Sequence, residues 1–519
     1  MITEFLIRKN EYHDSSFLMR VAKRISGQRG ILQAAALMGT EKNKTLLEKI
    51  GFHGAAVAAA TPNDLILAIQ ADNRENLATV LENVDQWLHP ESDTSETSTV
   101  RTLDEALARQ PNSNLAVISV PGEYARREAM KALDRGLNVF LFSDNVPIES
   151  ERSLKEYARE CGLIVMGPDC GTALIRGVGI GFANVIRRGP IGVIGASGTG
   201  LQEFTTLVHH AGSGISHAIG IGSRDLSDAI GGLSIFSAMD ALAADSETQV
   251  VAILSKPPGR QTLEKLLPHM ARYPKPVVGL FLGLKRLPGE NLPFRIARTL
   301  DDAAAIAVQV ATGHPPARST GIPFDIETHL HQEQEGKTKD QRYIRGLFAG
   351  GTFSYQAQQI FQDAGIFVYS NNPIEGNRAL SDPFRSVEHT IVDMGADEFT
   401  AGRPHPMIDS RFRCERIMAE AQDPQVAVLL LDVILGYNAS ADPAGELTAS
   451  IMKARRDSEQ RGTHLTVIVS VCGTEEDPQH LTRQIDRLRE AGATVFLSAS
   501  EAAFFSARLA ARIKENAHG

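Results

Sequence analysis

The sequence predicts an α/β protein built from several domains, most of them with parallel sheets. The chain has 519 residues, more than one domain of common size holds. Short apolar runs alternate with amphipathic stretches of helical spacing along most of its length. Many of the apolar runs end in glycine, serine or aspartate. Apolar strands that alternate with amphipathic helices indicate parallel sheets with both faces covered.

The composition of the chain argues against several classes of protein function. The net charge of −9 and the lack of a long basic run argue against nucleic acid as a partner. No apolar run reaches about 18 residues and no signal peptide precedes the first strand, so we expect no membrane segment and a cytoplasmic location. The 4 cysteines have no CxxC spacing, which argues against disulfides and structural zinc.

The first region, residues 1–95, predicts a small α/β module. Its expected strands are "EFLIRKN", "ILQAAALMG" and "DLILAIQA", and each precedes a helical stretch. The polar segment "HPESDTSETST" reads as a linker that ends this module.

The next regions repeat the strand–helix rhythm. Residues 96–187 contain the apolar strands "NLAVISVP", "NVFLFSD" and "LIVMGPD". Residues 188–318 and 343–519 hold further strands, from "IGVIGAS" to "KPVVGLFLG" and from "IRGLFAGG" to "ATVFLSAS". The last two regions share size and rhythm, which suggests a distant duplication. Residues 315–342 are polar and charged, and we expect a linker there.

Glycine-rich or acidic turns follow the expected strands, where parallel sheets place their ligands. The middle region has "GASGTG" (195–200), "GIGSRD" (220–225) and "SKPPG" (255–259). The last has "AGGTFS" (349–354), "DMGADEF" (393–399), "LGYNAS" (435–440) and "CGTEED" (472–477). Several combine glycine with Ser, Thr or Asn near a helix start, which favours binding of phosphate or carboxylate.

The turn "GASGTG" is compatible with helix capping and with anion binding. No GK[ST] follows it, so it is not a Walker A loop, and its glycines do not make GxGxxG. Ser197 and Thr199 either cap the helix or hold an anion, and the two roles are compatible.

The acidic segment "HTIVDMGADEFTAGRPHPMID" matches no metal-ligand spacing, so we predict no metal site there. Asp393 follows a strand and organises the loop. Arg403 and His405 either contact substrate or belong to a loop fixed by Pro404 and Pro406. Cys170 and Cys472 read as packed thiols, because no base can be assigned to either.

The motifs "AVISVP", "AMKALDRGLNVFLFSD", "LIVMGPDCG", "IGVIGASGTG" and "IGIGSRD" resemble the alpha subunit of succinyl-CoA synthetase over residues 100–312. Residues 343–519 resemble the carboxy-terminal ligase domain of its beta subunit. The complete arrangement, with "MGTEKNK" and "VDMGADEFTAGRPHPMID", resembles the FdrA family. The resemblance implies a CoA-binding-like Rossmann unit at 96–187 and two flavodoxin-like ligase domains, at 188–318 and 343–519.

The resemblance also implies a phosphate site. In the synthetase, two helices from two ligase domains direct their N-termini at one phosphate. One helix here follows Ser197, Gly198, Thr199 and Gly200. We match the second to the turn of Gly436, Tyr437 and Asn438. The turn of Gly350, Gly351 and Thr352, together with Asp393, completes the expected phosphate or substrate set.

The departures from the synthetase bear on the mechanism. The loop that carries the synthetase's phosphohistidine has no histidine here, in "LKRLPGENLPFRIARTL". The synthetase's glutamate after the preceding strand is Lys256. The nucleotide-grasping domain is absent, and the module at 1–95 replaces the first half of the CoA-binding domain. No cofactor is therefore required, and binding of CoA stays open.

Lys256 either neutralises a bound phosphate or is a solvated loop lysine. The FdrA resemblance implies a subunit of oxamate carbamoyltransferase in purine and allantoin breakdown, acting with two partner proteins on a carbamoyl phosphate. Lys256, His405 and Arg403 would then be the catalytic residues. The alternatives are an acyl-CoA synthetase subunit that binds CoA and a carboxylate, and a non-catalytic scaffold of the same fold.

Overall fold

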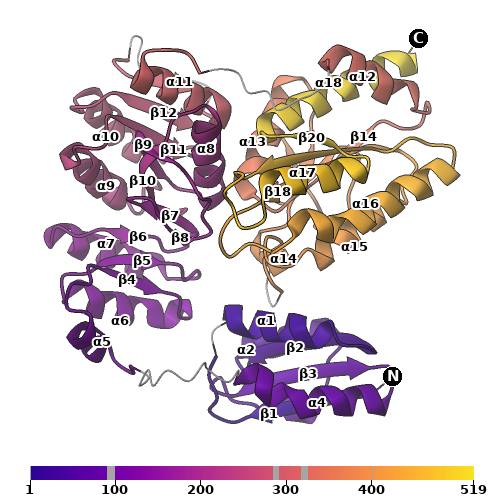
Figure 1. Cartoon of the computed structure of the whole chain (residues 1–519), viewed down its shortest axis with the longest axis horizontal. Coiled ribbons are helices and arrows are strands. Elements are labelled where there is room, and N and C mark those ends of the chain that lie inside the picture. The colour runs from indigo at the N-terminus through magenta and orange to yellow at the C-terminus, as the bar shows by residue number, and fades with distance from the viewer. Residues whose placement is uncertain are drawn as a thin grey trace. The chain divides into compact units, whose positions relative to one another are not determined.

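The computed structural model describes residues 2–13, 15–89, 100–284, 292–316, 325–400 and 403–518. The chain divides into two units, which are coloured by residue number in Figure 1. The first comprises Met1–Pro111 and Asp397–Pro404, and the second comprises Asn112–Ala396 and His405–Gly519. Among the described residues, no helix combines the length and apolarity needed to cross a membrane.

The first unit is built on a three-stranded antiparallel sheet of order β1-β3-β2. Helices α1 and α4 cover one face through a core that includes Leu18 and Val80, and Leu47 and Val57 of α2 and α3 pack on the other. The elements are β1 (Ile2–Arg8), α1 (Ser15–Ser26), β2 (Ile31–Met38), α2 (Glu41–Lys49), α3 (Ala55–Ala59), β3 (Leu65–Ala71), α4 (Arg74–Leu88), α5 (Leu103–Arg109) and α14 (Asp397–Thr400).

The second unit begins with a parallel three-stranded sheet of order β4-β5-β6. Each of its first two strands is followed by a helix, as the sequence predicts. The elements are β4 (Leu115–Ile118), α6 (Gly122–Leu133), β5 (Asn138–Leu141), α7 (Ile148–Glu160) and β6 (Val165–Met166).

A seven-stranded sheet follows, of order β13-β12-β11-β9-β10-β7-β8. It is parallel except at β7 and β8, which form an antiparallel edge that the sequence pattern did not indicate. The elements are β7 (Thr172–Ile175), β8 (Val178–Gly181), β9 (Arg188–Gly195), α8 (Gly198–His210), β10 (Ile215–Gly220), α9 (Leu233–Ala244), β11 (Val250–Ser255), α10 (Arg260–Ala271), β12 (Val277–Phe281), β13 (Arg295–Ala297) and α11 (Leu300–Thr312).

The last sheet has the order β16-β15-β17-β14-β18-β19-β20, and all its neighbours are parallel. Its elements are α12 (Ile326–Glu335), β14 (Tyr343–Phe348), α13 (Gly351–Asp363), β15 (Tyr369–Ser370), β16 (Arg378–Ala379), β17 (Thr390–Asp393), α15 (Arg411–Glu420), β18 (Val426–Ile434), α16 (Pro443–Gln460), β19 (Thr466–Cys472), α17 (Leu481–Glu490), β20 (Thr494–Phe496) and α18 (Ala499–His518).

The α/β class with parallel sheets is therefore confirmed, and one expectation about a connection is wrong. The polar stretch 315–342 was expected to be a linker, but it contains α12. This helix packs through His329 against Phe505 of α18, with ring centroids 5.5 Å apart. The sequence of α12, "IETHLHQEQE", has few apolar residues, which is why composition alone did not reveal the helix.

One hydrophobic core joins the two seven-stranded sheets. It contains Leu201 and Phe204 from α8 and Phe353 and Phe361 from α13, all at most 1% exposed. In each sheet the strand order reverses beside the first central strand, β9 or β14. The helices that follow these two strands are α8 and α13. Because ligands of open parallel sheets bind at such reversals, we expect a ligand site at the starts of these helices.

Candidate anion site between two helix N-termini

Helices α8 and α13 begin against one another. Ser197 caps α8, and its Oγ accepts a hydrogen bond from the Gly200 N–H at 3.5 Å. The same Oγ lies 2.5 Å from Oγ1 of Thr352, in the first turn of α13. A Cβ on Gly200 would lie 3.3 Å from Cγ2 of Thr352, so the contact is already close at this position. The structure thus brings together residues from the predicted turns 195–200 and 349–354.

A small pocket opens at this contact. Its polar wall is formed by Ser197, Ser255, Lys256 and Thr352, and its apolar wall by Leu254, Leu280, Leu282 and Leu300 beside Gly200. Its free volume of about 10 Å³ corresponds to roughly one water molecule. A phosphate group therefore fits only if a lining side chain moves outward.

Lys256 is the lining side chain with the freedom to move, because it is exposed. Its Nζ stands 5.6 Å from the centre of the Tyr355 ring, on the first turns of α13. The first N–H groups of a helix have no acceptor within the helix and carry a partial positive charge. Two such helix starts and one ammonium group make this pocket favourable for an anion.

Asp393 lies on the α13 side of the site, at the end of β17. Its Oδ1 accepts the Gly395 N–H at 3.0 Å, and its Oδ2 would lie 2.7 Å from a Cβ on Gly351. Burial raises the pKa of Asp393 to about 6, and the positive charge of Lys256 opposes this rise. A carboxyl group that titrates near neutral pH is suited to proton transfer.

Asp432 fixes the approach to α13 and was missed by sequence reasoning. Its two oxygens accept the N–H groups of Ala349 and Gly350, both at 2.8 Å, and Oδ1 also accepts from Nη2 of Arg413 at 2.7 Å. The side chain is fully buried. Its only sequence signal was an aspartate inside the apolar strand "VAVLLLDVI". Because Gly350 has its N–H engaged in this way, the donors left for a ligand begin at Gly351.

His405 lies close to the Asp393 loop. Its Nδ1 accepts the N–H of Met407 at 3.2 Å, so Nε2 carries the hydrogen of the neutral ring. Burial and the nearby charge of Arg413 lower the pKa of His405 to about 4. Nε2 would lie 2.6 Å from a Cβ on Gly395, the residue that donates to Asp393. His405 is therefore a neutral hydrogen-bond donor at physiological pH. Arg403 belongs to the segment Asp397–Pro404 of the first unit, and the structure does not group it with His405.

The expected position of the second helix needs correction. The turn of Gly436, Tyr437 and Asn438 does not lead into a helix start at the pocket, because α16 begins only at Pro443. The Tyr437 N–H donates to the Ala183 carbonyl at 2.8 Å, and Asn438 Nδ2 donates to the Gly181 carbonyl at 2.7 Å. These hydrogen bonds attach the turn to the end of β8 and to Ala183. The helix whose start contacts the start of α8 is α13.

Another strand-end turn is closed by side chains of the protein. The carboxylate of Asp225, in "GIGSRD", accepts from Lys155 Nζ at 2.8 Å, and both side chains are fully buried. Asp225 also caps α9 through the N–H groups of Ser234 and Ile235.

The buried thiols follow the sequence expectation. Burial raises the pKa of Cys170 to about 12 and holds the pKa of Cys472 well above its ordinary value. Neither sulfur is a nucleophile at physiological pH.

The position that a side chain on Gly198 would occupy faces protein rather than the pocket. A Cβ there would lie 3.0 Å from Oγ1 of Thr172. A larger side chain at Gly198 would therefore disturb β7 before it reached an anion, and Gly200 is the better position at which to probe the pocket.

Family models match three parts of the chain. They are the "AllF, heavy metal-associated domain" at residues 1–106, the "CoA binding domain" at 187–270 and "CoA-ligase" at 347–509. The helix pair described above draws one helix from each of the last two matches.

Two comparisons with curated proteins differ in extent. The "Uncharacterized protein YahF" of Escherichia coli is 38% identical over 498 residues, covering 95% of each chain. The "Succinate--CoA ligase [ADP-forming] subunit alpha 2" of Archaeoglobus fulgidus is 28% identical over 188 residues, covering 36% of this chain and 64% of that protein.

Solved structures add little. An ATP citrate lyase from Methanothrix soehngenii, in complex with citrate and coenzyme A, has 18% identity and a TM-score of 0.35, covering 44% of this chain and 45% of that one. A Ca. Korarchaeum cryptofilum acetyl-coenzyme A synthetase covers 78% of this chain and 84% of that one at a TM-score of 0.28 and 17% identity. Scores this low support no inference about function.

Proposed function

The chain belongs to the family of the Escherichia coli protein YahF, and from this premise we propose that it is a catalytic subunit that handles an acyl phosphate. The reaction we propose is that of oxamate carbamoyltransferase, in which oxalurate and phosphate give oxamate and carbamoyl phosphate. This proposal follows the resemblance of the sequence to the FdrA family. The AllF name of the model matched at the N-terminus is in keeping with a role in allantoin breakdown.

The contact between the starts of α8 and α13 carries the proposal. It joins Ser197 to Thr352 with an exposed ammonium group, that of Lys256, on the same pocket. This arrangement suits a dianionic group whose charge is spread over several oxygens. Carbamoyl phosphate and inorganic phosphate both have such a group, so one site serves the substrate and the product of the reaction.

The residues suggest how the reaction proceeds. A phosphate oxygen attacks the ureido carbonyl carbon of oxalurate, the bond from that carbon to the oxamate nitrogen breaks, and the nitrogen leaves with a proton. The helix starts and Lys256 hold the phosphate and stabilise the charge of the transition state. Asp393 in its neutral form supplies the proton, and the Nε2–H of His405 supplies a hydrogen bond to a carbonyl oxygen. No covalent intermediate on the protein is required.

A second candidate is an acyl-CoA synthetase subunit. The matches to the CoA-binding and CoA-ligase models favour it, because both name CoA chemistry. In this case the same pocket would hold an acyl phosphate that CoA then attacks, and a separate protein would supply the nucleotide site. CoA is therefore the one cofactor that this alternative requires.

The test is a pair of assays on the chain purified from its own host with a tag, together with the two partner proteins that we propose to associate with it. Oxalurate and phosphate should yield carbamoyl phosphate and oxamate without added CoA. Lys256→Met should lower this activity on the order of 10²–10³-fold, and Lys265→Met, which changes an exposed lysine of α10, should not.

ADP formation that depends on CoA and a carboxylate, without oxalurate phosphorolysis, would replace the first proposal by the second. Absence of both reactions in the purified assembly would contradict both proposals and would indicate a non-catalytic scaffold.

A further inference from the structure

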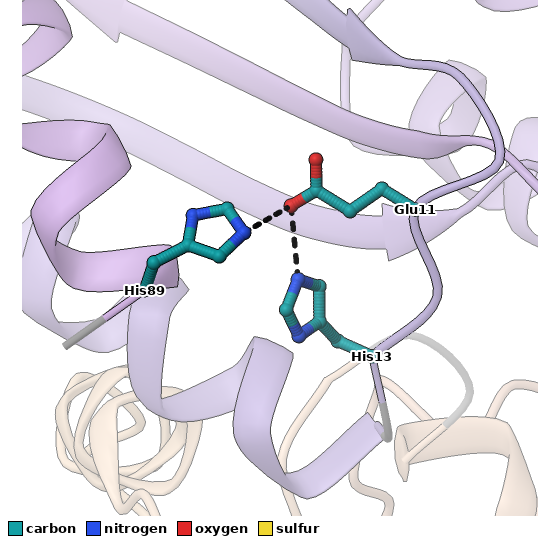
Figure 2. A group of neighbouring side chains, drawn as sticks. All are labelled: Glu11, His13 and His89. Carbon is teal, nitrogen blue, oxygen red and sulfur yellow. Dashed lines mark hydrogen bonds and ion pairs between the residues drawn. The ribbon is translucent and has the colours of Figure 1, made fainter. Parts of the chain in front are cut away.

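A second cluster of chemically active side chains lies in the first unit, apart from the pocket described above. Glu11, His13 and His89 point toward a common centre, as Figure 2 shows. Oε1 of Glu11 lies 3.0 Å from Nε2 of His13 and 3.6 Å from Nε2 of His89. One ligand atom from each of the three side chains lies within 4.8 Å of the others.

The local structure explains why these residues meet. Asn10 adopts a left-handed conformation, with φ of 55°, and its N–H donates to Oδ1 of Asp64 at 3.0 Å. This turn after β1 directs the following residues, Glu11 and His13, toward the end of α4. His89 is the C-cap of that helix. The three side chains therefore come from the beginning and the end of the module's sequence, and they meet in space.

The surroundings hold two of the three side chains in place. The His13 ring stacks on Phe17 of α1, with centroids 4.8 Å apart and an interplanar angle of 22°. The side chains of His13 and Glu11 are 18% and 23% exposed, whereas that of His89 is 63% exposed. The cluster thus has a fixed inner side and an outer side open to solvent.

The donor set and its spacing fit a transition-metal ion. In a tetrahedral zinc site with bonds of about 2.0–2.1 Å, neighbouring ligand atoms lie about 3.3 Å apart, and the two Glu11 distances bracket this value. Two imidazoles and one carboxylate bind zinc in sites that keep an open position, and they also bind non-haem iron(II). The sequence has no cysteine in residues 1–106, which disfavours soft ions such as copper(I).

We propose that Glu11, His13 and His89 bind a divalent transition-metal ion of the zinc class and leave one coordination position open to water or another ligand. The family model that matches residues 1–106 names heavy metals but no ligands, and the sequence spacing pointed to none. The inference rests on the side chains of this unit alone. It is independent of the function proposed for the anion pocket.

The experiment uses the full-length chain and Co²⁺ as a spectroscopic probe, because Co²⁺ in a tetrahedral N/O site gives strong visible bands. Wild-type protein should bind one Co²⁺ that Zn²⁺ displaces. Glu11→Gln and His13→Gln should each weaken this binding by about 100-fold or more, since loss of an outer partner alone costs 10–100-fold. His53→Gln is the matched control, because His53 is an exposed histidine of the same module outside the cluster.

His89→Ala keeps the test decisive if an inner variant fails to fold, because His89 is largely exposed and its loss leaves the core unchanged. This variant should lose the tetrahedral Co²⁺ spectrum with unchanged circular dichroism. Equal Co²⁺ affinity and spectra in wild type and His89→Ala, or in wild type and a folded His13→Gln variant, would overturn the proposed site.

Discussion

Two glycine turns of the same sheet are similar in sequence but differ in how their backbone groups are bonded. Residues 349–354, "AGGTFS", follow β14, and residues 435–440, "LGYNAS", follow β18. The first passes directly into α13, with Gly350 at φ of −95° as its N-cap. The second holds Gly436 at φ of 111°, with its N–H and carbonyl bonded to the side chain of Gln479.

The comparison shows what makes a strand-end glycine available to a ligand. A helix that is separated from its strand by only two residues presents unpaired N–H groups at the sheet edge. A turn with a left-handed glycine and six residues before the next helix instead uses its polar groups on neighbouring protein. The distance from glycine to helix start, rather than glycine itself, separates the two cases.

The largest expected effect concerns Lys256, whose side chain lines the same pocket as Thr352 at the start of α13. Lys256→Met should lower turnover on the order of 10²–10³-fold, the scale of losing one preorganised stabiliser of transition-state charge. Lys256→Ala should cost about the same, because charge and not bulk is responsible. Steady-state kinetics on both variants check this, with Lys265→Met as the control. Full activity in both would make Lys256 a solvated loop lysine.

A second prediction uses the carboxyl group beside α13. The pKa of Asp393 is raised from 3.8 to about 6, which means that the folded state binds the proton more tightly than the unfolded state does. The protonated carboxyl group therefore stabilises the folded state, and this stabilisation is lost as the pH rises through 6. Asp393→Asn should therefore stabilise the protein by up to about 3 kcal/mol above pH 7. The gain should vanish near pH 4, where the wild-type carboxyl is largely neutral.

Urea unfolding at pH 4, 6 and 8 measures this difference. A gain that is independent of pH would show that Asp393 is ionised throughout this range. The same variant should lose activity if the carboxyl group transfers the proton.

The docked turn gives a third prediction. A Cβ on Gly436 would lie 2.4 Å from the Ala183 carbonyl oxygen, and the positive φ adds strain. Gly436→Ala should lower the free energy of unfolding by about 1–3 kcal/mol and leave the affinity for phosphate unchanged. Urea unfolding and phosphate titration on the same sample check both parts. Loss of phosphate binding without loss of stability would show that this turn is part of the anion site.

The smallest effect is expected at the contact of the two helices. Gly200→Val places a branched side chain against Thr352 and should weaken phosphate binding on the order of tenfold, about 1.4 kcal/mol. The methyl groups of valine also crowd this buried contact and should lower the stability somewhat, and removal of a glycine from a helix offsets only a part of that loss. Calorimetric titration with inorganic phosphate measures it. The cap variant Thr102→Ala, at the start of α5 in the first unit, serves as control.

Sequence reasoning captured the periodic features of the fold and less of the site. The strand runs were visible because each is a nearly continuous apolar segment, as in "VAVLLLDVI". Helix α12 was missed because its apolar positions are few, and β7 and β8 were missed because each is only 4 residues long. The first helix start was located from "GASGTG", whose Ser197 is both a cap and a pocket residue.

The rest depended on distance in space. Nothing in the sequence ranks Gly350 above Gly436, because the difference lies in the length of the connection to the next helix and in the partner that each turn meets. Asp432 could be noticed only as an aspartate in an apolar strand. Glu11 and His89 approach each other because β1 and α4 end at the same side of the first unit, and no spacing rule relates residues so far apart in the chain.

The proposed phosphate site is tested most directly by a crystal structure of the full chain soaked with carbamoyl phosphate. We expect the phosphate group between the first N–H groups of α8 and α13, close to Thr199 and Thr352, with Lys256 turned away from Tyr355 to meet it. A phosphate group bound instead at Gly436, or no density between the two helix starts at a saturating concentration, would show that the two helix starts are not the phosphate site.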